Sequence, residues 1–171
     1  MGEAERAYEK ALAYLERRDR TEKEIRDRLA GAGFPEDIAC ATLGRLKDAG
    51  LVDDEGYAAR YLEALAGKGR GRLRIAEEMR RKGLPDALVR NALEDGISDE
   101  DERARAAEAA RLAWAGIPGG TDRRKAAARV SRRLITLGFA YETIGAVMGE
   151  ARDMEATGAD MGEARLLGED E

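Results

Sequence analysis

Residues 123–133 form a segment whose side chains are suited to binding an anion. The segment carries six Lys or Arg residues and no Asp or Glu, a balance of +6. Like charges four residues apart destabilise a helix by roughly 0.2–0.5 kcal/mol per pair, so we expect an external anion to compensate. The alternative is pairing with acids in residues 94–102 or near the C-terminus. On a helix, four of the bases form a stripe opposite Val130, Leu134 and Leu137, namely Lys125, Arg129, Arg132 and Arg133.

A second basic segment covers residues 66–82 and holds seven bases against Glu77 and Glu78, a balance of +5. Its functional interpretation is contact with phosphate groups or with an acidic protein groove. The alternative is an ordinary solvated surface. Three of the bases would share one helix face if a helix began early, namely Arg70, Arg74 and Arg81. The candidate contacts in this segment are Lys68, Arg70, Arg72, Arg74, Arg81 and Lys82.

The sequence holds few residues suited to catalysis. It has no His, which is the usual acid or base at neutral pH, and no His/Cys metal cluster or serine–base arrangement. Cys40 neighbours apolar residues, so we expect an inert, partly buried thiol. Residues 53–55 are all acidic and could bind a divalent metal, but helix capping explains them more simply. We therefore expect no cofactor, no metal site and no enzymatic activity.

Gly67, Gly69 and Gly71 resemble a phosphate-binding loop only superficially. The pattern G-x-x-x-x-G-K-[ST] is absent, and no predicted strand precedes the glycines. We expect instead a flexible linker that bears Lys and Arg.

The elements that must position these residues form an internal repeat. A Gly followed by a bulky apolar residue recurs at residues 33–34, 83–84 and 138–139, at spacings of 50 and 55 residues. The apolar positions before it recur as well, as Ile25 and Leu29, Ile75 and Met79, and Val130 and Leu134. A repeat array builds an extended surface rather than a pocket, which favours a binding protein over an enzyme.

Each repeat is predicted to contain three helices, which makes the fold class all-α with helix-turn-helix-like units. In the first repeat, Thr21 and Glu24 form a capping box, and Gly33 suits the positive-φ position after the helix that follows. Pro35 suits the start of a third helix. The predicted units are residues 1–52, 53–97 and a degenerate third repeat at 98–151. An acidic tail at 152–171 lacks periodicity, and we expect it to be a frayed helix or disordered.

Composition favours helices with solvated faces, because 38% of residues are charged and only 5% are aromatic. The net charge of −5 is unevenly distributed, since residues 150–171 carry eight acids against Arg152 and Arg165. The rest of the chain is therefore close to +1. A single Cys, a polar N-terminus and no apolar run of about 18 residues lead us to expect a cytoplasmic protein.

Three stretches of this sequence resemble the RecX family of bacterial recombination regulators. The first runs from Ala11-Leu12-x-x-Leu15 to Thr21-Glu22-x-Glu24-Ile25-x-x-x-Leu29. The second runs from Gly33-Phe34 to Leu51-Val52-Asp53-Asp54-x-x-Tyr57-Ala58. The third is Lys68-Gly69-x-Gly71-x-x-x-Ile75-x-x-Glu78-Met79-x-x-Lys82-Gly83-Leu84. The resemblance covers residues 1–95, whereas the third repeat matches only in pattern.

The resemblance implies an elongated, curved array of tandem three-helix repeats. It implies binding to the filament of the RecA recombinase on single-stranded DNA, within the helical groove. The implied effect is inhibition of filament extension, ATP hydrolysis and strand exchange. The expected protein is a monomeric regulator with no membrane partner and weak direct DNA binding.

Two other classes of function stay open. A DNA-binding protein with helix-turn-helix units would show sequence preference, but Asn91 is the sole Asn and the chain has no Gln, which argues against base readout. A carboxylate-dependent enzyme would show metal-dependent turnover.

Overall fold

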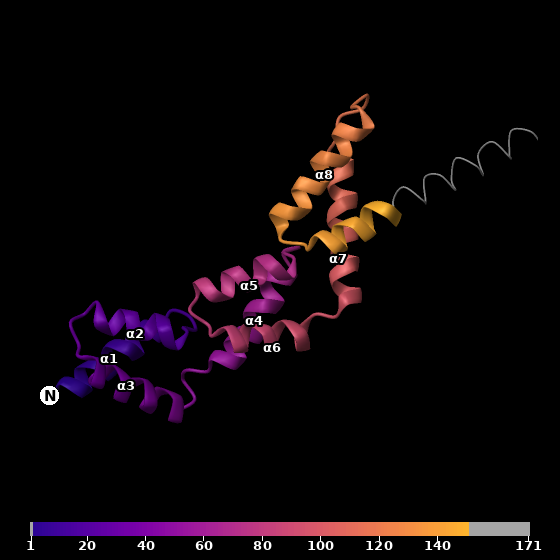
Figure 1. Cartoon of the computed structure of the whole chain (residues 1–171). Helices are drawn as coiled ribbons and strands as arrows, with labels where there is room; N and C mark the ends of the chain where they lie inside the picture. The colour runs from indigo at the N-terminus through magenta and orange to yellow at the C-terminus, as the bar shows by residue number, and fades with distance from the viewer. Residues whose placement is uncertain (1, 151–171) are drawn as a thin grey trace, which may run out of the picture. The chain divides into compact units, whose positions relative to one another are not determined.

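The structure, a computed structural model, describes residues 2–150, and all regular structure in this range is helical (Figure 1). Residues 141–150 form a helix at the end of this range. The prediction of an all-α fold of tandem helical units is thus confirmed. None of the described helices is long and apolar enough to span a membrane. The earlier helices are α1 Glu3–Leu15, α2 Glu22–Ala30, α3 Glu36–Asp48, α4 Asp54–Ala66, α5 Arg72–Arg81, α6 Asp86–Gly96, α7 Asp99–Ala115 and α8 Arg123–Leu137.

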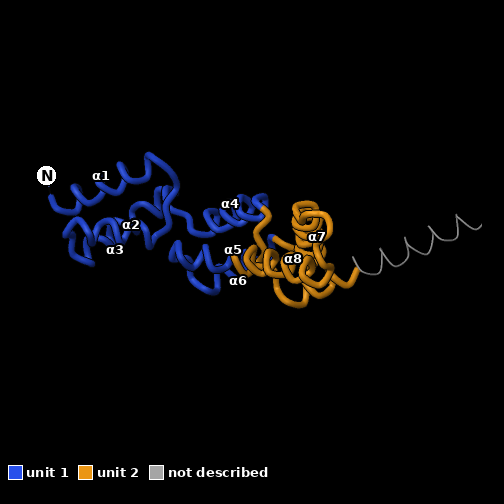
Figure 2. The backbone as a smooth tube through the Cα atoms, turned by 90° about the horizontal axis from the view of Figure 1, so that it is seen from above, with its two compact units in different colours: residues 1–68, 75–96 blue, residues 69–74, 97–171 orange. Residues whose placement is uncertain are grey.

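The described chain divides into two compact units (Figure 2). Within the described range, unit 1 comprises residues 2–68 and 75–96, and unit 2 comprises Gly69–Arg74 and residues 97–150. Helix α5 contributes its first residues to unit 2 and the remainder to unit 1. The repeat boundaries at 52, 97 and 151 stay predictions, and the predicted tail at 152–171 lies outside the described residues.

Short-range signals in the sequence set the helix ends. Thr21 accepts a hydrogen bond from the Glu24 amide while the Glu24 carboxylate accepts from Thr21 N, which confirms the capping box. Ser98 and Asp101 form the same reciprocal pair at α7. Gly33, Gly83 and Gly138 all have positive φ, at 85°, 84° and 89°, as predicted for residues that follow a helix.

The core of the first repeat, in unit 1, brings α1, α2 and α3 into contact. Ala7 and Ala11 present small side chains that let the helices approach closely, and both are fully buried. Ile25, Leu29 and Leu46 fill the remaining space. Burying one such aliphatic side chain stabilises the fold by about 1.5–3 kcal/mol.

The core of unit 2 determines which side of α8 faces solvent. Ala106 and Ala110 of α7 pack with Val130 and Leu134 of α8. The chain after α8 closes the cluster with Phe139, Ile144 and Val147. Because the apolar edge of α8 is held in this core, its opposite side stays exposed.

Candidate functional site

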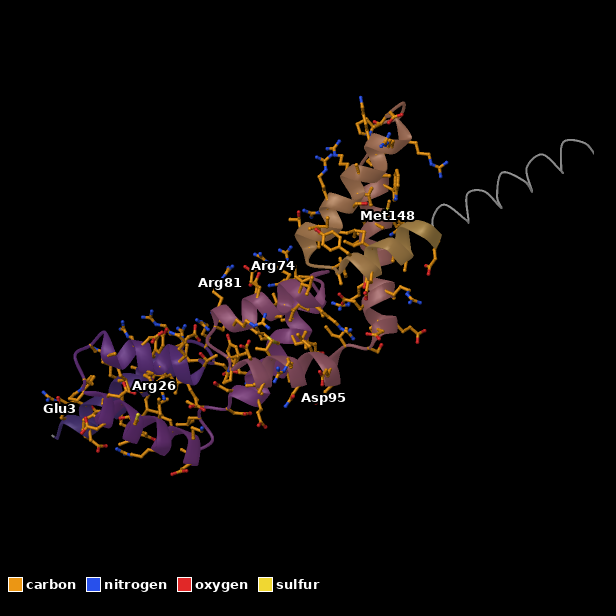
Figure 3. The ribbon with its side chains drawn as sticks, viewed as in Figure 1. Glu3, Arg26, Arg74, Arg81, Asp95 and Met148 are labelled. Carbon is orange, nitrogen blue, oxygen red and sulfur yellow. The ribbon has the colours of Figure 1, made fainter. Side chains whose placement is uncertain are left out.

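The exposed side of α8 carries Lys125, Arg129, Arg132 and Arg133, which we call the α8 basic face. All four residues are exposed, whereas Ala126, Val130, Leu134 and Leu137 on the other side are buried. Nitrogen-tipped side chains project from α8 in Figure 3. The predicted stripe opposite the apolar edge is therefore present in the structure.

The α8 basic face is not neutralised within residues 2–150, where no acidic side chain forms an ion pair with any of its four residues. Asp122, the nearest acid in sequence, caps the helix by accepting from Lys125 N at 3.0 Å. Arg132 Nε donates to the Ala128 carbonyl of the same helix at 3.2 Å. The alternative of pairing with acids of residues 94–102 does not occur in the structure.

The corresponding helices of the other repeats, α2 and α5, carry a different arrangement of charges. In α2, Lys23 pairs with Asp27 at 2.5 Å, and in α5, Arg81 pairs with Glu77 at 2.9 Å. The repeat spacings of 50 and 55 place Arg132 of α8 where Asp27 and Glu77 stand. Each of the first two helices therefore has an internal neutralising pair, and α8 has a base in place of the acid.

The first turn of α8 adds further positive charge. Because α2 begins at Glu22 and α5 at Arg72, the repeat spacing would start α8 at Ala127, yet α8 begins four residues earlier, at Arg123. The extra turn consists largely of bases and lies at the positive end of the helix dipole. Such placement costs roughly 0.3–1 kcal/mol per charge, which an external anion would offset.

Arg72, a candidate contact, lies instead in a network inside unit 2. Its Nη1 pairs with Asp99 at 2.6 Å, and its backbone N–H donates to Glu102 Oε1 at 2.9 Å. Its Nη2 donates to the Ile97 carbonyl, and its Nε is buried without a partner among the described residues. These contacts indicate that Arg72 stabilises the fold of unit 2.

Lys82 and Arg81 are also engaged with neighbouring side chains. Lys82 Nζ lies 3.2 Å from Glu24 Oε1, and the Lys82 carbonyl accepts from Thr21 Oγ1 at 2.7 Å. Burial by itself would raise the pKa of Glu24, but hydrogen bonds from Arg18, Lys82 and Thr21 outweigh it and lower that pKa. Lys82 thus links α5 to the first turn of α2.

The remaining candidates of the first basic segment do not share one helix face. Arg70 precedes the start of α5 at Arg72, so the early helix start that would place it on one face with Arg74 and Arg81 does not occur. Arg70 is half-buried, and its carbonyl accepts from Arg105 at 2.7 Å. Lys68 is exposed, whereas Arg74 is half-buried. Arg74 and Arg81 are labelled in Figure 3.

The glycine-rich stretch is not a free linker, which corrects the prediction. Gly71 N donates to the Leu137 carbonyl at 2.9 Å, and Leu73 N donates to the Gly138 carbonyl at 3.1 Å. A Cβ on Gly71 would lie 2.6 Å from Phe139 N, closer than side chains tolerate. Glycine is required here because two backbone segments approach each other closely.

Two minor candidates are Cys40 and the acidic residues 53–55. Cys40 is exposed rather than partly buried, and the hydrogen bond to Glu36 raises the pKa of its thiol. A raised pKa disfavours the reactive thiolate, so the expectation of an inert thiol is supported.

Asp53 caps α4 by accepting from Gly56 N, and Asp54 accepts from Glu22 N at 2.9 Å. No group of three potential metal ligands occurs in the described chain.

These observations define a class, an all-α protein of tandem three-helix units with an exposed basic face on α8. The family model for the first three-helix domain of RecX matches residues 7–46, and the model for the second matches residues 53–93. Several relatives described as regulatory protein RecX match most of the chain. The chain belongs to the RecX family.

The similarity extends over most of the length of several relatives. The chain is 32% identical over 148 residues to the regulatory protein RecX of Halorhodospira halophila, covering 86% of this chain and 89% of that one. For the Mycolicibacterium vanbaalenii protein the identity is 39% over 137 residues, covering 78% and 72%. The Levilactobacillus brevis protein is 37% identical, but the match spans only 50% of its length.

Two crystal structures share the fold. RecX from Lactobacillus salivarius superposes with a TM-score of 0.78 at 26% identity, covering 86% of this chain and 95% of that one. A second structure, titled regulatory protein RecX, gives a TM-score of 0.75 at 26% identity, covering 84% and 72%.

Proposed function

We propose that this protein regulates the RecA recombinase by binding its filament on single-stranded DNA. Binding inhibits filament extension, ATP hydrolysis and strand exchange, and so modulates recombinational repair. Family membership supports a regulatory role, because the relatives are described as regulatory proteins. The observation that carries the proposal is the α8 basic face, whose four bases have no acidic partner among residues 2–150. A filament of acidic protein surface and DNA phosphate supplies the missing anions.

The protein acts by binding rather than by turnover. The full sequence has no His, and its repeats create surface rather than a concave pocket. Regulation by binding requires only that the bound filament differ in stability or dynamics from the free one.

The test is ATP hydrolysis by RecA on single-stranded DNA with this protein titrated in. Inhibition well below one molecule per recombinase protomer is expected if a few bound molecules block filament extension. Unchanged hydrolysis at a molar excess, with the protein folded, would disprove the proposal.

The α8 basic face is the principal contact surface, with Lys68, Arg74 and Arg81 as secondary contacts. Reversing Lys125, Arg129, Arg132 and Arg133 to Glu should abolish inhibition while circular dichroism stays helical. A matched control reverses four exposed bases elsewhere, giving the same change in net charge: Arg6, Lys10, Arg17 and Arg103. Loss of inhibition in both variants, or in neither, would contradict the assignment.

An alternative function is direct binding to nucleic acid without the recombinase. The α8 basic face is equally suited to phosphate groups, and such binding weakens steeply with salt. Comparing binding to naked duplex DNA with the effect on recombinase activity distinguishes the two functions. If naked duplex is bound tightly and recombinase activity is unaffected, the alternative replaces the proposal.

A further inference from the structure

We propose that Tyr14, Arg20 and Arg28 form a binding site for a phosphate group. The three residues belong to the first repeat, in unit 1, whereas the α8 basic face belongs to unit 2. The site is therefore a second anion-binding surface, built from a different repeat. It does not rest on the proposed function.

Two guanidinium groups converge on the ring of Tyr14. The Cζ atom of Arg20 lies 3.8 Å from the ring centroid, and the Cζ atom of Arg28 lies 5.6 Å from it. Neither arginine forms an ion pair with an acid of residues 2–150. The face of an aromatic ring attracts a cation, but two cations beside one ring repel each other. A bound anion would offset that repulsion.

The neighbouring Tyr8 shows the neutralised form of the same contact. The Cζ atom of Arg45 lies 4.0 Å from the Tyr8 ring centroid, and Arg45 Nη1 also pairs with Glu5 at 3.5 Å. Tyr8 thus has one arginine and one acid, whereas Tyr14 has two arginines and, within the described range, no acid. An external phosphate would supply at Tyr14 the negative charge that Glu5 supplies at Tyr8.

The first repeat holds the three side chains in place before a ligand binds. Tyr14 lies in the last turn of α1 and packs, half-buried, against the core that α1 shares with α2 and α3. Arg20 lies between α1 and α2, and its Nε donates to the Tyr14 carbonyl at 3.4 Å. Arg28 lies in the last turn of α2. A guanidinium already held against a fixed ring loses less freedom on binding, which favours affinity.

The available donors suit a phosphate better than a carboxylate. Both Nη groups of Arg20 and all three nitrogens of Arg28 have no hydrogen-bond acceptor among residues 2–150. One guanidinium fork satisfies both oxygens of a carboxylate, whereas a phosphate has further oxygens for a second guanidinium. The phosphate can be a free one or a phosphodiester of nucleic acid, because both present such oxygens.

Nitrogen-15 NMR of the full chain tests the site with inorganic phosphate, added at constant ionic strength with chloride as the balancing anion. The Nε–Hε signals of Arg20 and Arg28 should shift together and saturate. The Arg45 signal is the internal control, because Glu5 already pairs with that guanidinium. Equal shifts at all three arginines, or no shift at Arg20 and Arg28, would overturn the proposal.

Variants measure what the two arginines contribute, with the ring signal of Tyr14 as the reporter. Arg20→Gln combined with Arg28→Gln should weaken phosphate binding by about tenfold or more. Arg20→Lys combined with Arg28→Lys keeps the charge but loses the planar fork, so its affinity should be intermediate. The matched control, Arg6→Gln combined with Arg45→Gln, removes the same charge from the same repeat. A similar loss in this control, with all variants helical by circular dichroism, would refute the site.

A dinucleotide distinguishes the two sources of phosphate. Thymidylyl-thymidine contains a single phosphodiester and is titrated in the same way. If it binds at Arg20 and Arg28 more tightly than inorganic phosphate, the ligand is nucleic acid, and if it binds more weakly, the ligand is a free phosphate. Neither measurement involves RecA, so this site can fail while the proposed function stands, and the proposed function can fail while this site stands.

Discussion

Glu102 is an acid whose role depends on its surroundings rather than on its type. Its side chain is 5% exposed, and it accepts from the Arg72 backbone N–H while pairing with Arg105. Glu108 forms the same i,i+3 pair with Arg111 on the same helix, but both side chains are more than half exposed. One helix thus carries a buried and an exposed version of a single interaction.

Replacing Glu102 with Ala should lower the free energy of unfolding by about 3 kcal/mol, because it leaves Arg105 and the Arg72 amide without their partner. Urea unfolding measures the loss. The control, Glu108→Ala, should leave the midpoint unchanged, since solvent already screens that pair. Equal effects of the two substitutions would show that burial at Glu102 is unimportant.

Glu24 should make the fold sensitive to acid. Because hydrogen bonds lower its pKa in the folded chain, its stabilising contribution is present above its usual pKa and is lost as the pH falls through the lowered value. The difference in unfolding free energy between the natural chain and Glu24→Gln should therefore shrink between about pH 6 and pH 3. Thermal or urea unfolding across that range measures it.

Asp54 supplies a control of opposite sign. Burial raises its pKa against the hydrogen bond from the Glu22 amide, so its ionised form destabilises the fold and protonation relieves the cost. Relative to Asp54→Asn, the natural chain should become more stable as the pH falls. Parallel pH trends for the two sites would contradict both assignments.

At the scale of helices, one docking pattern is used twice. In unit 1 the first turn of α2 binds the Lys82 carbonyl through Thr21 and the Asp54 carboxylate through Glu22 N. In unit 2, Gly71 N, just before α5, donates to the Leu137 carbonyl, and Arg72 N, at the first residue of α5, donates to Glu102. The start of each second helix is therefore capped by the repeat that follows it.

Gly33 and Gly138 occupy the same repeat position. Comparing their substitution by Ala distinguishes the cost of backbone strain from the cost of a steric clash. Both have positive φ, but a Cβ on Gly33 meets nothing within 4 Å, whereas one on Gly138 would lie 2.8 Å from Arg74 Cα. Gly33→Ala should cost about 1–2 kcal/mol of backbone strain. Gly138→Ala should cost at least about 1 kcal/mol more, because it pushes two backbones apart. Urea unfolding compares them, and equal losses would refute the close approach.

The sequence predicted what depends on local patterns. The capping box at Thr21, the positive-φ glycines and the apolar edge of α8 all follow from neighbours within a few residues. The contacts of Gly71 and Glu102 could not be predicted in this way, because their partners lie far along the chain. A glycine in a charged stretch and an acid on an acidic helix carry no local sign of what they will contact.

The distribution of charge over the whole molecule matters more than its total of −5. The α8 basic face concentrates positive charge on one exposed helix side, and salt screens that charge over about 10 Å at 0.1 M. Inhibition of RecA should therefore weaken as salt rises from about 50 to 200 mM. Hydrolysis assays at several salt concentrations measure this trend, and a variant with the α8 basic face converted to Gln should show little of it. Salt-independent inhibition would point to an apolar contact instead.

Because α2 and α5 are capped by the next repeat, the amides at their starts can be used to follow the separation of neighbouring repeats by hydrogen exchange. The first amides of a helix have no intrahelical acceptor and normally exchange their hydrogens with water rapidly. The amides of Glu22, Gly71 and Arg72 do have acceptors, and those acceptors belong to the following repeat. Deuterium uptake at these three positions thus records the separation of adjacent repeats, while uptake in the helix interiors records their melting. The free energy that couples one repeat to the next can be measured one junction at a time.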